Sequence, residues 1–203
     1  QTMLEKEKGS IAKKIPLATT LFIIGLGVYL LTRFIALDKF PIYFFSDEAI
    51  QTMTAKDLLS RGLRDANGGL FPVYFENGGQ YNLSFSVWLQ TLIAWLPNSV
   101  WLTRGLPAFF SLIFPLSAGF FLRDHLKARF WWLTPFLVSV IPAWFLHSCT
   151  AFETALGASF YCSFLLLYAN YRLKDRRWLI PALAAGALAF YSYSPLQLVV
   201  VLT

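Results

Sequence analysis

The most constraining feature of the sequence is a series of apolar segments of membrane length, the first of which covers residues 17–37. A helix needs about 20 mostly apolar residues to cross a hydrocarbon core of roughly 30 Å. The whole chain is 57% hydrophobic and only 14% charged, far from the composition of soluble globular domains. We therefore expect an all-α fold, a polytopic membrane helix bundle.

The basic residues lie in short clusters between the apolar segments, at 6–14, 123–129 and 172–177. Cytoplasmic loops of membrane proteins carry an excess of Lys and Arg, so we expect these three clusters to lie in the cytoplasm. The net charge of +6 is accounted for by such clusters rather than by one basic face. This distribution argues against nucleic acid as a partner.

The clusters fix an expected topology. Residues 80–96 are ambiguous, because Phe85, Trp88, Leu89 and Leu92 form a one-sided helical stripe typical of a helix lying on a surface. If this segment crossed, both later basic clusters would face outward, so we expect it to lie on the outer surface. The five expected transmembrane helices are 17–37 (outward), 104–122 (inward), 130–146 (outward), 154–171 (inward) and 178–193 (outward).

The expected domain organisation is simple. Residues 1–16 form a cytoplasmic segment, and residues 17–203 form a single membrane domain with an outer loop at 38–103. A second outer juxtamembrane helix is expected at 48–61, with Met53 and Leu58 toward its buried face. The chain ends in a short apolar run, so we expect it to be truncated at the C-terminus. The two cysteines indicate neither a disulfide framework nor a zinc site.

Two adjacent carboxylates, Asp47 and Glu48, directly follow the first expected span. Such a pair could position a base, a divalent cation or a cationic group. It could also begin a helix, with Ser46 as N-cap and both acids near the positive end of the helix dipole. The two interpretations are compatible.

The expected topology brings further polar residues to the same outer side, namely Arg104, His147, Glu153 and residues 191–194. Each also has a plainer interpretation: Arg104 as an anchor, His147 as an interfacial residue and Glu153 as a helix-start acid. Arg33, near the end of the first span, is expected to snorkel to the interface. We expect Asp47, Glu48, Arg104 and Glu153 to line one outward-opening cavity, with the Asp47 and Glu153 carboxyl carbons within roughly 12 Å, near the Debye length.

Four motifs occur in a characteristic order: Phe-Ser-Asp-Glu at 45–48, Thr-Arg-Gly-Leu-Pro at 103–107, His-Ser-Cys-Thr-Ala-Phe-Glu at 147–153 and Tyr-Ser-Tyr-Ser-Pro at 191–195. In this order the chain resembles the N-terminal half of the polyprenyl-phosphate-sugar glycosyltransferases of GT-C fold, such as the protein O-mannosyltransferases and the lipid A aminoarabinose transferases. The resemblance covers most of residues 17–198. Where many relatives have Lys-Pro near the lipid phosphate, this sequence has Tyr81-Asn82.

The resemblance implies transfer of a sugar from a polyprenyl-phosphate lipid to an unidentified acceptor, by an integral protein of the bacterial inner membrane with its site facing outward. It implies catalytic roles for Asp47, Glu48 and Glu153, with a divalent cation, if any, on Asp47 and Glu153. Substrate binding is expected from Arg104, His147, Tyr81 and Tyr193. The alternative is a non-catalytic GT-C-like subunit that scaffolds a larger membrane protein complex. A transporter is less favoured, because the charges lie at the boundary rather than within spans.

Overall fold

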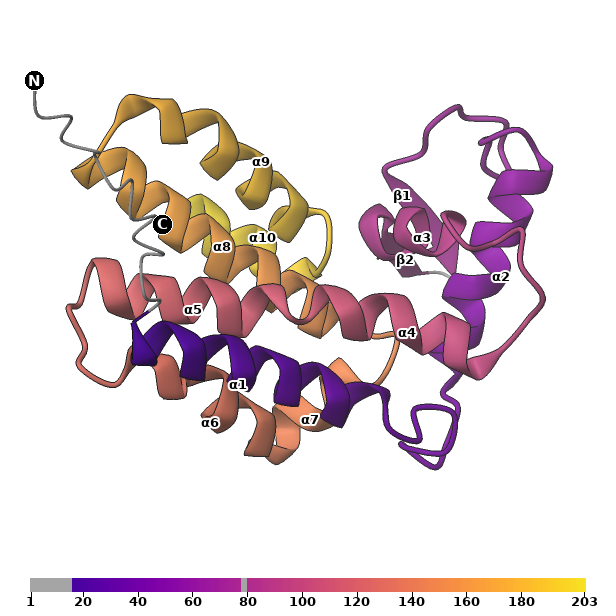
Figure 1. The fold of residues 1–203 in the computed structure, drawn as a ribbon. Helices are drawn as coiled ribbons and strands as arrows, with labels where there is room; N and C mark the ends of the chain where they lie inside the picture. Colours follow the sequence, from indigo (N-terminus) through magenta and orange to yellow (C-terminus); the bar gives the residue numbers. More distant parts are fainter. Residues whose placement is uncertain (1–15, 78–79) are drawn as a thin grey trace, which may run out of the picture.

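The computed structural model describes residues 16–77 and 80–203, and the structure is mostly helical, with 69% helix and 4% strand. All but the last residue of the expected cytoplasmic segment 1–16 lies outside the described residues. Figure 1 shows a bundle of helices running along a common direction, with a smaller lobe at one end. The lobe contains α2, α3 and a two-stranded hairpin.

The elements follow one another along the chain with mostly short connections, except for the longer loops 35–45 and 61–73. The first half contains α1 (Leu17–Phe34), α2 (Ser46–Ser60), β1 (Tyr74–Asn77), β2 (Gln80–Leu83), α3 (Ser84–Thr91), α4 (Val100–Phe110) and α5 (Ile113–Asp124). The second half contains η1 (Trp131–Leu133), α6 (Thr134–Val140), α7 (Pro142–Ser148), α8 (Glu153–Leu173), η2 (Arg176–Trp178), α9 (Leu179–Phe190) and α10 (Ser194–Leu202). Strands β1 and β2 pair antiparallel.

Close approach of the bundle helices depends on small residues. The Phe22 ring of α1 lies where a Cβ would stand on Gly119 of α5, and a Cβ on Gly25 would come within 2.7 Å of Pro135 and Phe136. Phe22 also packs on Trp131, with ring centroids 4.8 Å apart. Helix α8 packs between α5 and α9 in the same way, so the bundle is held together by interlocking aromatic and small side chains.

Two helical segments are long and apolar enough to cross a membrane, α1 and the continuous stretch Val100–Asp124 formed by α4 and α5. A third is obtained if α7 and α8, which meet at an angle of 107°, are counted as one broken span. These segments correspond to the first, second and fourth expected spans, the last with α7 added. The five-span arrangement stays a prediction.

The expected continuous helix 130–146 is wrong in detail, because it is divided into η1, α6 and α7. Pro142 has no N–H to donate to the Val138 carbonyl one turn earlier, and the helix breaks there. The freed carbonyl accepts a hydrogen bond from Arg33 Nη2 at 3.3 Å. Arg33 is fully buried and lies over the Tyr29 and Phe145 rings, so the expectation that it snorkels to the interface is also wrong.

Residues 80–96 do not form one helix. The first four continue the hairpin as β2, and α3 has only eight residues, which is too short to cross a bilayer. Helix α3 packs on α2 through Ala55, Leu58 and Val87. Of the residues expected to share one face of α2, Leu58 is buried and Met53 is 60% exposed, and the face that packs within the protein is formed by Glu48, Gln51, Ala55 and Leu58.

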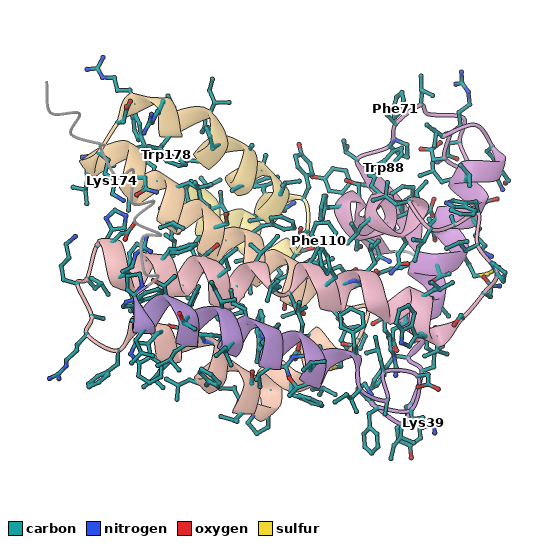
Figure 2. All side chains as sticks on the ribbon, viewed as in Figure 1. Lys39, Phe71, Trp88, Phe110, Lys174 and Trp178 are labelled. Atoms are coloured by element: carbon teal, nitrogen blue, oxygen red, sulfur yellow. The ribbon has the colours of Figure 1, made fainter. Side chains whose placement is uncertain are left out.

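The two later basic clusters lie at the same end of the bundle, as expected. Lys174 Nζ is 3.0 Å from the Asp124 carboxylate, and His125 Nε2 is 3.0 Å from Asn170 Oδ1. In Figure 2, Lys174 and Trp178 lie at this end, and Lys39 lies at the other. We call these the basic end, defined by loops 123–129 and 172–177, and the acidic end, defined by Asp47 and Glu153. Which side of a membrane each end faces stays a prediction.

Candidate functional site

The acidic end is organised by a contact between the start of α2 and the start of α8. The residues that immediately precede the two helices, Phe45 and Phe152, pack together with ring centroids 5.1 Å apart. The Ala151 N–H also donates to Glu48 Oε1 at 2.9 Å. Because of these contacts, Asp47 and Glu153, each in the first turn of its helix, lie close enough for their carboxylates to repel each other.

The N-terminal cap of α2 differs from the expected one. Phe45 occupies the N-cap position, and Ser46 is already the first helical residue. The carboxylate of Glu48 reaches back and accepts the Phe45 N–H at 3.1 Å, which is half of a capping box. Glu48 therefore caps the helix, while Asp47 is left exposed beside it.

Glu48 and Arg104 form a buried ion pair with no unused hydrogen-bonding capacity. Arg104 Nε and Nη2 donate to the two oxygens of Glu48, each at 2.9 Å. The three remaining N–H groups of the guanidinium donate to backbone carbonyls of the loop between α1 and α2, at Leu37 (3.2 Å), Pro41 (2.9 Å) and Tyr43 (2.7 Å). Since a guanidinium has five N–H donors, all of them are in use.

This closed network bears on two expected roles. Arg104 has no donor left for a lipid phosphate, and the two oxygens of Glu48 accept four N–H groups between them. Both side chains are at most 1% exposed. They therefore do not line an open cavity, which differs from the expectation from the sequence. Their catalytic and substrate-binding roles stay predictions, and the geometry shows them ordering the loop beside Asp47.

Glu153 is half-buried and lies near the amide of Gln51, which is one turn beyond Asp47 on α2. Neither polar atom of Gln51 has a hydrogen-bond partner of regular geometry among the described residues. Gln51 is only 1% exposed, which makes its unpaired amide unusual.

The remaining predicted site residues separate into two groups. The His147 ring lies 6.0 Å from that of Phe152, and its Nδ1 is buried without a partner in the described part of the chain. Tyr193 packs on α8 one turn after Glu153, since a Cβ on Gly157 would come within 2.8 Å of Tyr193 Cβ. Both therefore lie near the acid pair.

Tyr81 lies elsewhere. It lines a hollow of about 200 Å³ between the hairpin and the C-terminal half of α2, together with Asp57 and Arg64. A second hollow of about 280 Å³, lined by Phe44, Met53 and Thr103 among others, lies between α2 and the start of α4. Tyr81 is thus not brought to the acid pair.

A divalent cation was the one cofactor that the sequence left open. Within residues 16–77 and 80–203, no three His, Cys, Asp or Glu side chains gather as a cation site. Asp47 and Glu153 alone provide too few oxygen ligands for Ca²⁺, whereas Mg²⁺ is held by one or two carboxylates together with waters and substrate phosphates. No step of the chemistry below depends on a cation.

The sequence analysis missed three buried polar side chains, Gln51, Ser86 and Gln90, which all have polar atoms without partners among the described residues. Gln51 shares a helical face with Ala55 and Leu58. A polar residue in register with an apolar stripe is the signal that would have identified it.

The fold and site of the described residues define a mostly helical protein with two or three helices apolar enough to cross a membrane. Comparison with protein-family models, curated proteins and solved structures finds no match.

Proposed function

We propose that this protein transfers a sugar from a polyprenyl-phosphate donor to an acceptor on the outer face of the membrane, with Asp47 as the general base. One observation carries the proposal: of the two adjacent acids, Glu48 is fully engaged with Arg104, whereas Asp47 is exposed and held beside Glu153. A base must reach the proton that it removes. Asp47 has that freedom, and the buried network beneath it holds its helix in place.

The chemistry requires little beyond these groups. Asp47 takes the proton of an acceptor hydroxyl or amine, and the acceptor atom forms a bond to the anomeric carbon. The bond from that carbon to the phosphate oxygen breaks, and polyprenyl phosphate leaves with the bonding electron pair. A single displacement of this kind inverts the anomeric centre. Orientation of the two substrates supplies much of the rate, since well-oriented reactions gain up to roughly 7–11 kcal/mol.

Glu153 and Glu48 have different parts in this proposal. Glu153 lies beside Asp47, where its carboxylate oxygens accept hydrogen bonds from hydroxyl groups of the sugar. Glu48 acts through Arg104 as a positioning residue, because their network fixes the loop between α1 and α2.

The test is Asp47→Asn in the full-length protein, in membrane vesicles supplied with polyprenyl-phosphate-linked mannose, glucose or aminoarabinose. The readout is conversion of the donor to polyprenyl phosphate. We expect a loss of roughly 10²–10⁴-fold, the usual contribution of a general base, with the melting temperature unchanged. Asp57→Asn is the matched control, because Asp57 is an exposed acid on the same helix that pairs with Arg61. Equal turnover by both variants refutes the role of Asp47.

A non-catalytic subunit is the second candidate, and one observation favours it. Arg104, the expected phosphate ligand, makes five internal hydrogen bonds and has no donor left for a phosphate. If wild-type vesicles convert none of the donors but the protein co-purifies with a glycosyltransferase whose activity falls when it is removed, the scaffold function replaces the enzyme.

A further inference from the structure

Helix α2 presents two adjacent polar stripes with opposite hydrogen-bonding states. The first stripe, Glu48 and Thr52, faces α4 and is satisfied. Glu48 pairs with Arg104, and the Thr52 hydroxyl lies 3.1 Å from that of Thr103 while also donating to the Glu48 carbonyl at 2.9 Å. This stripe accounts for how α2 is anchored to the bundle.

The second stripe, Asp47 and Gln51, faces Glu153 and is not satisfied. Asp47 is exposed at the start of α2, and Gln51 lies one turn further along at 1% exposure, with both amide atoms unpartnered in the described structure. Beyond them, Ala55 and Leu58 continue the face as apolar core. Along this stripe, an exposed acid is therefore followed by the buried amide of Gln51 and then by apolar core residues.

Helix α3 adds further unpaired groups to the same junction. Ser86 and Gln90 lie on one face, four residues apart, and each is 2% exposed. Gln90 Nε2 donates to the Thr103 carbonyl at 2.7 Å, which places it next to the Thr52–Thr103 contact, while its Oε1 and the Ser86 Oγ have no partner in the described part of the chain. Helices α2 and α3, which pack on each other through Ala55, Leu58 and Val87, thus both carry buried polar atoms without partners in the described structure.

A folded chain rarely tolerates such groups without a reason. Roughly 90% or more of buried polar groups are hydrogen-bonded, and each one left unpaired costs about 1–3 kcal/mol. An apolar side chain at position 51 would fit the stripe of Ala55 and Leu58 without this cost. The amide is therefore explained by a partner that arrives from outside the chain.

We propose that Gln51, supported by Ser86 and Gln90, is a subsite for the hydroxyl groups of an uncharged sugar whose outer hydroxyls are held by Asp47 and Glu153. An amide offers two donors and a carbonyl acceptor, which match a hydroxyl group that both donates and accepts. The flanking carboxylates accept hydroxyl protons. A ligand reaches Gln51 only when the side chains that cover it rotate, a change that is common at binding surfaces.

The identification of the ligand as a sugar rests on the proposed function. The observation that buried polar atoms of Gln51 have no partner in the described structure does not depend on it. The experiment therefore uses free monosaccharides and stability, with no turnover measurement. The protein is purified in a detergent without a sugar headgroup, and its melting temperature is recorded with increasing D-mannose, D-glucose or L-arabinose. Glycine betaine, an osmolyte without hydroxyl groups, provides the baseline for nonspecific stabilisation.

The variant is Gln51→Met, which keeps the length of the side chain and removes its hydrogen-bonding groups. Without sugar, we expect its melting temperature to equal or exceed that of the wild type, because no hydrogen bond is lost. With sugar, we expect specific protection in the wild type and an apparent Kd about tenfold weaker in the variant, for the loss of one or two hydrogen bonds. Thr52→Val is the matched control from the satisfied stripe, and it should lower the melting temperature while leaving the apparent Kd unchanged.

Two results overturn the proposal. If Gln51→Met melts well below the wild type and no sugar protects either protein, fixed waters satisfy the amide and there is no subsite. If sugar protects both proteins equally, the sugar binds elsewhere. Protection that depends on Gln51, combined with no turnover of any lipid-linked donor, supports the subsite and removes the proposed transferase function.

Discussion

Replacement of Arg104 by lysine tests whether the Glu48–Arg104 network holds the acidic end together. Lysine keeps the charge, but it has three donors where arginine uses five. At least two of these five hydrogen bonds are lost, and a hydrogen bond made by a charged group contributes about 1.5–3 kcal/mol. The expected loss of stability is about 3–6 kcal/mol, which corresponds to a fall in melting temperature of roughly 6–24 °C for a domain of this size.

The assay is tryptophan fluorescence during thermal unfolding in detergent, together with limited proteolysis. Because three of the served carbonyls belong to the segment between Leu37 and Tyr43, cleavage there should precede global unfolding in Arg104→Lys. Arg61→Lys is the control, since the Arg61–Asp57 pair is exposed and exposed pairs contribute about 0–1 kcal/mol. If Arg104→Lys melts within a degree of the wild type and resists proteolysis, the network is not what orders this loop.

Two further predictions concern the bundle. Cysteines introduced at Lys127 and Lys174 should both be shielded from an impermeant thiol reagent in intact cells, since the two loops meet at one end and are expected in the cytoplasm; labelling of both reverses the topology. Arg33→Met should cost about 1–3 kcal/mol by leaving the Val138 carbonyl unpaired, and Pro142→Ala, which restores an N–H one turn away, should recover most of that loss in a double-mutant cycle. Purely additive effects on the melting temperature contradict the pairing of Arg33 with the proline break.

The sequence was most informative where the pattern is long and one kind of side chain dominates. Apolar runs of membrane length predicted α1 and the Val100–Asp124 stretch, and the spacing of basic clusters predicted that loops 123–129 and 172–177 lie together. Both predictions depend on hydropathy or charge summed over many residues, so that one exceptional residue changes the result little. The contact between Lys174 and Asp124 follows from that placement.

The sequence was less informative where one residue alters the backbone. Residues 130–146 were expected to form one span, but Pro142 divides α6 from α7, and the direction of the chain then changes again before α8. Likewise, the apolar stripe of residues 80–96 concealed the change from β2 to α3. Periodicity averages over a window, so it cannot locate a break or a change of element within that window.

The sequence could not distinguish the roles of residues of the same type, because those roles depend on partners far along the chain. Arg33 and Arg104 both lie near the ends of apolar segments, yet one is held by ring faces and a carbonyl, and the other by a carboxylate. Asp47 and Glu48 are neighbours, and a rotation of about 100° along α2 turns one toward Arg104 and the other toward solvent. The acid that completes a buried ion pair is stabilised by it and unavailable for chemistry. Its neighbour Asp47, held by the same helix, is exposed to solvent, which is why the candidate site centres on Asp47 and not on the pair.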